Sequence, residues 1–124
     1  MISIGELFKL FLETLKHSNS NVLTLSDDLM EHYLLEEFAI EAPAYLSKFT
    51  LDRLANEGII DEEIFEKSKK LKDVYFSMNQ MKVWDSFSIK KSSEWKGVFS
   101  LSDQICELID KKWTGKEIEY LKTI

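Results

Sequence analysis

Two histidines and one cysteine are the side chains of this 124-residue sequence best suited to bind metal or act as nucleophiles. Glu13 precedes His17 by four residues and Asp28 precedes His32 by four, so on a helix each pair shares one face. A carboxylate-bridged di-iron bundle needs Glu-x-x-His on two helices and two further glutamates, and neither histidine has a glutamate three positions before it. We therefore interpret the pairs as ion pairs on helix surfaces and predict no metal and no cofactor.

Cys106 lies within a stripe of apolar residues, whereas a nucleophilic cysteine needs a lowered pKa and a nearby base. We expect a buried structural thiol. The sequence has no Gly-x-Ser-x-Gly or His-Glu-x-x-His motif, and its four glycines leave little material for a phosphate-binding loop. These features predict a protein that is not an enzyme; an enzyme subunit or small hydrolase is the least favoured alternative.

The elements that position these residues are predicted to be helices. Apolar residues recur at spacings of three and four, and four glycines and one proline leave few helix breakers. The length suits one domain with its own core. We predict an all-α fold, a compact bundle of five to six helices without a sheet, formed by residues 1–124 as a single domain.

The first half of the chain contains two long predicted helices. Ser3 and Glu6 match a capping box before a helix that ends near His17. After a polar loop at 18–21, Thr24 is the expected cap of a second helix over 25–41. Its apolar residues, Leu29 and Ile40 among them, cover more than half of its circumference, with its carboxylates exposed. The proline at position 43 should end it.

The remaining helices are predicted from their end signals. Ser47 can cap a short helix that carries Phe49, Leu51 and Leu54 and ends at Gly58. A cap at position 61 should start the fourth helix, which runs to 78. Residues 79–92 are the least regular part, either a short helix or a loop over the core. Ser92 or Ser93 should cap the fifth helix, and residues 114 and 117 form a capping box for a last short one.

Composition also bears on compartment and on classes of partner. A single cysteine, the absence of a signal-like start and the absence of a long apolar run lead us to expect a cytoplasmic protein that does not enter membranes. One arginine stands beside 15 lysines, and the isoelectric point is near 5.0. Because bidentate arginine dominates base readout in DNA grooves, direct nucleic-acid binding is not expected.

Charge is divided unevenly along the chain. Residues 1–66 hold 14 acidic and 4 basic side chains, whereas residues 67–124 hold 8 and 12. An acidic surface is ordinarily only a solvated face, but here the lysines that usually intersperse one lie in the other half. A cationic partner would compensate for the resulting repulsion. Trp84 is more simply a core or lid residue, but an aromatic in an irregular segment is also a common interface anchor. The predicted partner-binding residues are Glu37, Glu41, Asp52, Glu57, Asp61, Glu62, Glu63, Glu66 and Trp84.

Three segments resemble a known class of protein. The opening IGELFKLFLETL, the following EHYLLEEF and the later WKGVFSLSDQICELI are similar to the short amphipathic helices of bacterial immunity proteins. These proteins neutralise nuclease toxins of the colicin and contact-dependent-inhibition kinds. The resemblance implies a stoichiometric inhibitor that binds a basic toxin domain and blocks its active site, with carboxylates where the toxin would meet phosphates. The lysine-rich second half departs from this pattern.

The sequence thus favours a non-enzymatic immunity or antitoxin protein whose acidic helices bind a cationic protein, expected to be a toxin nuclease domain. The alternative is a helical regulatory or adaptor module whose groove takes a helix of a partner protein. The co-purifying partner would distinguish the two, because a toxin domain is expected for the first and a polymerase or regulator for the second.

Overall fold

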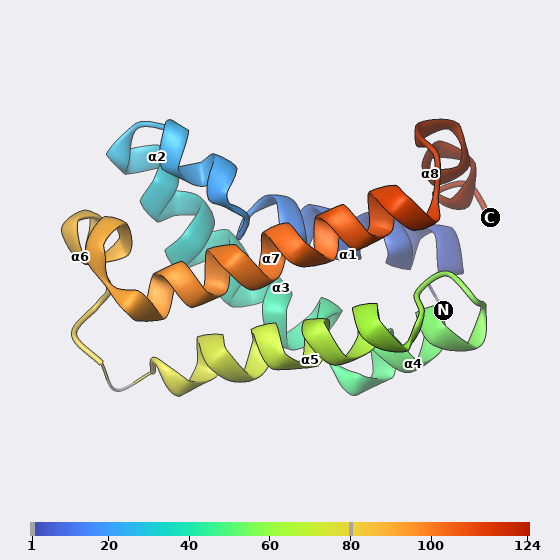
Figure 1. Cartoon of the computed structure of the whole chain (residues 1–124), viewed down its shortest axis with the longest axis horizontal. Coiled ribbons are helices and arrows are strands. Elements are labelled where there is room, and N and C mark those ends of the chain that lie inside the picture. The colour runs from blue at the N-terminus through green and yellow to red at the C-terminus, as the bar shows by residue number, and fades with distance from the viewer. Residues whose placement is uncertain (1, 80) are drawn as a thin grey trace.

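The computed structural model describes residues 2–79 and 81–124, and every regular element within them is helical (Figure 1). The all-α prediction is confirmed, although the chain divides into more helical segments than the expected five to six. The segments are α1 (Ile4–Lys16), η1 (Ser20–Thr24), α2 (Asp27–Glu31), η2 (His32–Glu37), α3 (Phe38–Tyr45), α4 (Lys48–Asn56), α5 (Glu62–Ser77), α6 (Ser86–Lys91), α7 (Ser93–Lys112) and α8 (Gly115–Leu121).

The two longest helices, α5 and α7, lie side by side and run in opposite directions across the molecule (Figure 1). Their apolar stripes face a core to which α1 and α3 also contribute. Trp95 of α7 is fully buried in this core, as are Phe8 and Phe11 of α1 and Phe38 of α3. The antiparallel pairing is a consequence of tertiary packing, and it brings the start of α5 next to the end of α7.

Most helix starts follow the predicted caps. The side chains of Ser3, Ser47 and Asp61 each accept a hydrogen bond from the backbone N–H three residues later. Thr114 and Glu117 form the reciprocal capping box before α8. Each of these bonds satisfies a backbone donor that the helix itself leaves free. Gly58 adopts the predicted left-handed conformation after α4, with φ of 73°.

The second predicted helix is the main correction. It begins at Asp27 with Ser26 as its cap, because Thr24 belongs to the 3₁₀ turn η1 and donates instead to the carbonyl of Asn21. It also continues through Pro43 to Tyr45, where the carbonyl of Ala42 accepts a hydrogen bond from the N–H of Leu46. Burial of Phe38, Ala42 and Leu46 therefore outweighs the preference of the residue before a proline for extended geometry.

The segment η2 is π-helical, and it changes which side chains of this long helix are buried. A π-turn closes hydrogen bonds five residues back, as the N–H of Phe38 does with the carbonyl of Tyr33. The residues after it are therefore rotated relative to an uninterrupted α-helix. Ile40, predicted to lie in the apolar stripe, is 73% exposed, whereas the predicted surface residue Glu41 is only 8% exposed. Leu29, also predicted to lie in the stripe, is exposed as well, but it precedes η2.

Two further segments were undecided or wrong in the sequence analysis. Residues 79–92 contain a short helix, α6, capped by Asp85, so the helical alternative is correct; Gln80 lies outside the described residues. Ser92, rather than its neighbour, caps α7. Phe49 of α4 is largely exposed, because the core-facing side of this short helix is filled by Thr50, Leu51 and Leu54.

Within the described ranges, no helix is long and apolar enough to cross a membrane.

Candidate protein-binding surfaces

Six of the predicted binding residues lie on α4, on the turn after it and at the start of α5, and we call them the acidic patch. They are Asp52, Glu57, Asp61, Glu62, Glu63 and Glu66. Five of the six are exposed, and Asp52 is partly exposed and paired with Lys48. Asp61 caps α5 by accepting a hydrogen bond from the N–H of Ile64 at 2.9 Å. No other described residue forms an ion pair with the remaining four carboxylates.

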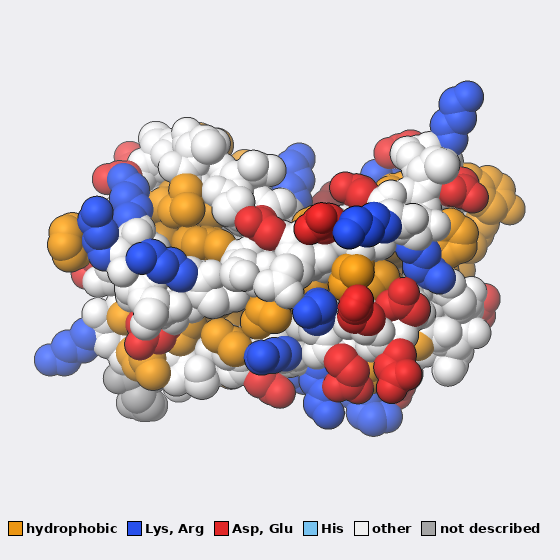
Figure 2. Space-filling view, viewed as in Figure 1, with side chains coloured by type: hydrophobic (Ala, Val, Ile, Leu, Met, Phe, Trp, Pro, Cys, Tyr) orange, Lys and Arg blue, Asp and Glu red, His pale blue; other side chains and the backbone are white. Residues whose placement is uncertain are grey.

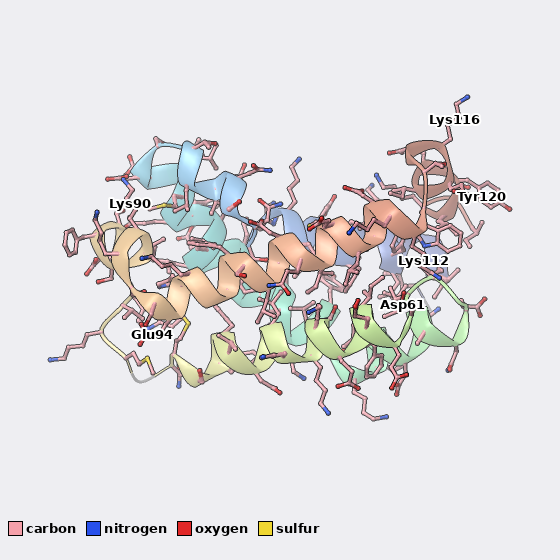
Figure 3. The ribbon with its side chains drawn as sticks, in the orientation of Figure 1. Asp61, Lys90, Glu94, Lys112, Lys116 and Tyr120 are labelled. Atoms are coloured by element: carbon pink, nitrogen blue, oxygen red, sulfur yellow. The ribbon has the colours of Figure 1, made fainter. Side chains whose placement is uncertain are left out.

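The fold brings lysines of the second half close to this patch. The indole N–H of Trp113, just after α7, donates to the carbonyl of Ile59, just before α5, at 2.9 Å. Lys112 therefore lies at the same end of the molecule as Asp61 (Figure 3). Figure 2 shows acidic and basic side chains interspersed over this end. The charge separation of the sequence is partly cancelled in space, although Lys111 pairs with Glu107 of its own helix rather than with the patch.

Glu41 and Glu37 lie apart from the acidic patch, in a cluster that contains both histidines. His17 Nδ1 is 2.7 Å from Glu41 Oε1, and the His17 ring stacks on Tyr33 with centroids 4.7 Å apart. His32, whose ring lies tilted against Tyr33 with centroids 5.6 Å apart, contacts Glu37 at 3.3 Å and also Glu36. The predicted pairs of His17 with Glu13 and His32 with Asp28 are thus wrong. The backbone spacing is regular, since the N–H groups of His17 and His32 donate to the carbonyls of Glu13 and Asp28. The imidazole rings bond instead to carboxylates that lie later in the chain.

This histidine cluster has limited chemical scope in the structure. Burial raises the pKa of Glu41 above its ordinary value, although the hydrogen bond from His17 opposes the rise. Among the described residues, both histidines hydrogen-bond to carboxylates and neither bonds to a hydroxyl or thiol. In that same part of the chain, no group of three or more His, Cys, Asp or Glu side chains is arranged to hold a metal ion. The cluster therefore links α1 to η2 and α3.

Trp84 lies beside a groove between η2, α3 and the end of α5. The groove has a volume of about 420 Å³ and is lined by Leu35, Ala39, Tyr75, Phe76, Asn79 and Trp84. The indole N–H of Trp84 donates to the carbonyl of Met78, and its ring packs edge-on against Tyr75 and Trp95. Trp84 is thus a lid on the aromatic core and also one wall of the groove, and its role as an interface anchor stays a prediction.

The other residues that line the groove were not predicted from the sequence. Phe76, at the edge of the groove, is 45% exposed. In α5 it lies off the stripe of buried residues, which are Ile64, Ser68, Leu71 and Tyr75. A large apolar residue outside the core stripe was the available signal. Leu35 and Ala39 had no comparable signal, because the π-helical segment determines which way they face.

A second hollow continues the groove toward α2. It is lined by Asp28, Glu31, His32, Leu35 and Glu36, and the two hollows meet at Leu35. Glu31 is engaged, since its carboxylate accepts hydrogen bonds from the N–H and hydroxyl of Ser86. Asp28 and Glu36 are exposed, and Glu36 bonds to the ring of His32, which also lines this hollow. The groove therefore has an apolar part and an acidic end.

Trp84 and the acidic patch lie at opposite ends of α5. Trp84 packs on Tyr75, thirteen residues after Glu62, which corresponds to about 20 Å along a helix. Trp84 is therefore too far from the acidic patch to be an apolar anchor beside it.

Cys106 is half-buried on α7 and packs against the core. Burial raises the pKa of its thiol to about 11. A thiol with a raised pKa is poorly suited to nucleophilic attack.

Comparison of the sequence with protein-family models and with curated proteins, and of the structure with solved structures, finds no match.

Proposed function

We propose that this chain is a non-enzymatic inhibitor of the immunity or antitoxin type, which binds a cationic protein, a toxin nuclease domain, and blocks its active site. The observation that supports the proposal is the acidic patch. Glu57, Glu62, Glu63 and Glu66 are exposed on one end of the molecule and form no ion pair with another described residue. Exposed carboxylates without an ion-pair partner contribute a local field that attracts a basic partner, although lysines at the same end of the molecule weaken it.

The experiment first isolates the partner and then measures how fast the partner associates with this chain. The wild-type chain is used to capture its partner from the native host, and the association rate constant is measured over a range of ionic strength. Glu62→Lys combined with Glu66→Lys should slow association at low ionic strength by about tenfold or more, because steering by charge sets the encounter rate. The dependence on salt should also weaken.

The control changes the same amount of charge elsewhere. Asp73→Lys combined with Glu119→Lys alters two exposed carboxylates outside the patch. This variant should slow association less, and both variants should melt close to the wild type, because exposed charges contribute about 1 kcal/mol or less to stability. An acidic partner, or one that associates equally fast with the patch variant, would refute the proposal. Inhibition is checked by whether one equivalent of the chain abolishes the partner's nuclease activity.

A helical adaptor or regulator is the second candidate, and the groove at Trp84 favours it. A groove lined by two helices and bordered by a half-exposed phenylalanine suits a helix of another protein. This candidate predicts that the captured partner is a polymerase or transcriptional regulator, and that its binding does not depend on Glu62 and Glu66.

A further inference from the structure

The groove between η2, α3 and α5 has a floor that is already fixed in place. Tyr75 at the base of the groove is buried, and its hydroxyl lies 3.5 Å from the carbonyl of Leu34. Its ring packs edge-on against Phe38, with the ring centroids 4.6 Å apart. Trp84, which forms one wall, is held by its hydrogen bond to Met78. A partner therefore meets a preformed apolar surface and does not have to order it, which lowers the entropic cost of binding.

The edge of the groove has apolar surface that the chain leaves uncovered. Phe76 has nearly half of its surface in contact with solvent, although its neighbour Tyr75 is buried. Ala39 faces it from α3 and is small enough to let another backbone approach closely. A helix of a partner that packed between α3 and α5 would bury Phe76 and fill the space above Ala39.

The charges around the groove specify what that helix should carry. Its continuation toward α2 is bordered by the exposed carboxylates of Asp28 and of Glu36, the second of which bonds to His32. Neither part is lined by a lysine or arginine among the described residues. Three other hollows on the molecule are each bordered by two or three lysines. The groove is therefore electrostatically suited to a cationic ligand at one end and an apolar ligand along its floor.

We propose that the groove is the docking site for an amphipathic helix of the protein partner, with apolar side chains on one face and lysine or arginine at the end that lies over Asp28 and Glu36. The inference rests on the proposed function in one respect, that the partner is a cationic protein. It adds a second contact surface, about 20 Å along α5 from the acidic patch. Apolar residues of the helix at positions i, i+3 or i+4, and i+7 would contact Leu35, Ala39 and Phe76.

The test uses a random library of displayed peptides about 16 residues long, enough for four helical turns. Peptides selected on the wild-type chain should share apolar residues at helical spacing and basic residues at one end. They are then synthesised with a fluorescent label, and their affinities are measured by fluorescence anisotropy. Ala39→Gln should weaken binding about tenfold or more by filling the groove. Ala44→Gln, the same change at an exposed position of the same helix, should leave binding unchanged.

Two further variants test the apolar edge and the acidic end of the groove separately. Phe76→Gln removes the exposed apolar edge and should weaken binding even if Ala39→Gln melts at a lower temperature than the wild type. Asp28→Asn combined with Glu36→Gln should weaken binding and reduce its salt dependence, whereas Glu62→Gln combined with Glu66→Gln should not.

Selected peptides that lack basic residues, or that bind both groove variants as tightly as the wild type, would refute the inference. So would a dimer of this chain that Ala39→Gln dissociates, since a second copy would then occupy the groove. If binding follows Glu62 and Glu66 instead, the groove inference fails while the acidic-patch proposal stands. A captured partner that is acidic would contradict the proposed function separately.

Discussion

His17 Nδ1 and Glu41 Oε1 lie 2.7 Å apart although the two residues are separated by 24 positions in the sequence. The contact ties the end of α1 to α3, and Tyr33 of the π-helical segment stacks on the imidazole. Both side chains are largely buried. A buried carboxylate needs such a partner, because its desolvation otherwise disfavours the charged form.

Replacement of Glu41 should change how stability depends on pH. Burial raises the pKa of Glu41 above its ordinary 4.5, so the folded protein holds this proton more tightly than the unfolded chain does. The resulting stabilisation is complete below pH 4.5 and is lost as the pH rises through the folded-state pKa. Relative to Glu41→Gln, the free energy of unfolding of the wild type should therefore fall over this interval.

Chemical denaturation at a series of pH values measures this difference. Glu36→Gln is the matched control, because it removes a carboxylate that also contacts a histidine but is exposed. A difference between wild type and Glu41→Gln that grows in favour of the wild type as the pH rises would show that the His17 contact outweighs burial.

Gly5 should not tolerate a side chain. Its N–H donates to the carbonyl of Ile124 at 3.0 Å, and a Cβ at this position would lie 2.7 Å from the backbone N and O of Ile124 and from the carbonyl O of Lys122. Backbone atoms cannot rotate away as the end of a side chain can. Gly5→Ala should therefore lower the free energy of unfolding by about 1–3 kcal/mol, as other overpacked sites do.

Thermal and chemical denaturation measure the effect of this substitution. Gly115→Ala is the control, since a Cβ there meets open space at the start of α8. Equal stability of the two variants would mean that the segment after α8 moves away from α1 at little cost.

The thiol of Cys106 should react slowly with a disulfide reagent in the native protein. Burial raises its pKa to about 11, so at pH 8 only about one molecule in a thousand carries the reactive thiolate. We expect reaction at least about tenfold slower than in denaturant, where an unperturbed thiol has a pKa of about 8.5. Equal native and denatured rates would contradict the burial of Cys106, and Cys106→Ala provides the blank.

The amino-acid sequence by itself determined the helical class and most helix starts. A cap acts through one hydrogen bond to a backbone group three residues away, as Ser47 does with Thr50 and Asp61 with Ile64. The apolar spacing of α7 likewise placed Trp95 and Ile105 in the core. Such signals depend on neighbouring residues only, so they can be recognised without knowledge of the fold.

Tertiary structure decided which predicted site residues lie together. The π-helical segment rotated the residues after it, which buried Glu41 and exposed Ile40, and core packing carried the helix past Pro43. The antiparallel packing of α5 on α7 brought Lys112 to the end that holds Asp61, and it left Trp84 at the other end. These outcomes depend on the packing of side chains distant in sequence, whose energies exceed the local preferences of single residues. Periodicity and capping signals therefore could not reveal them.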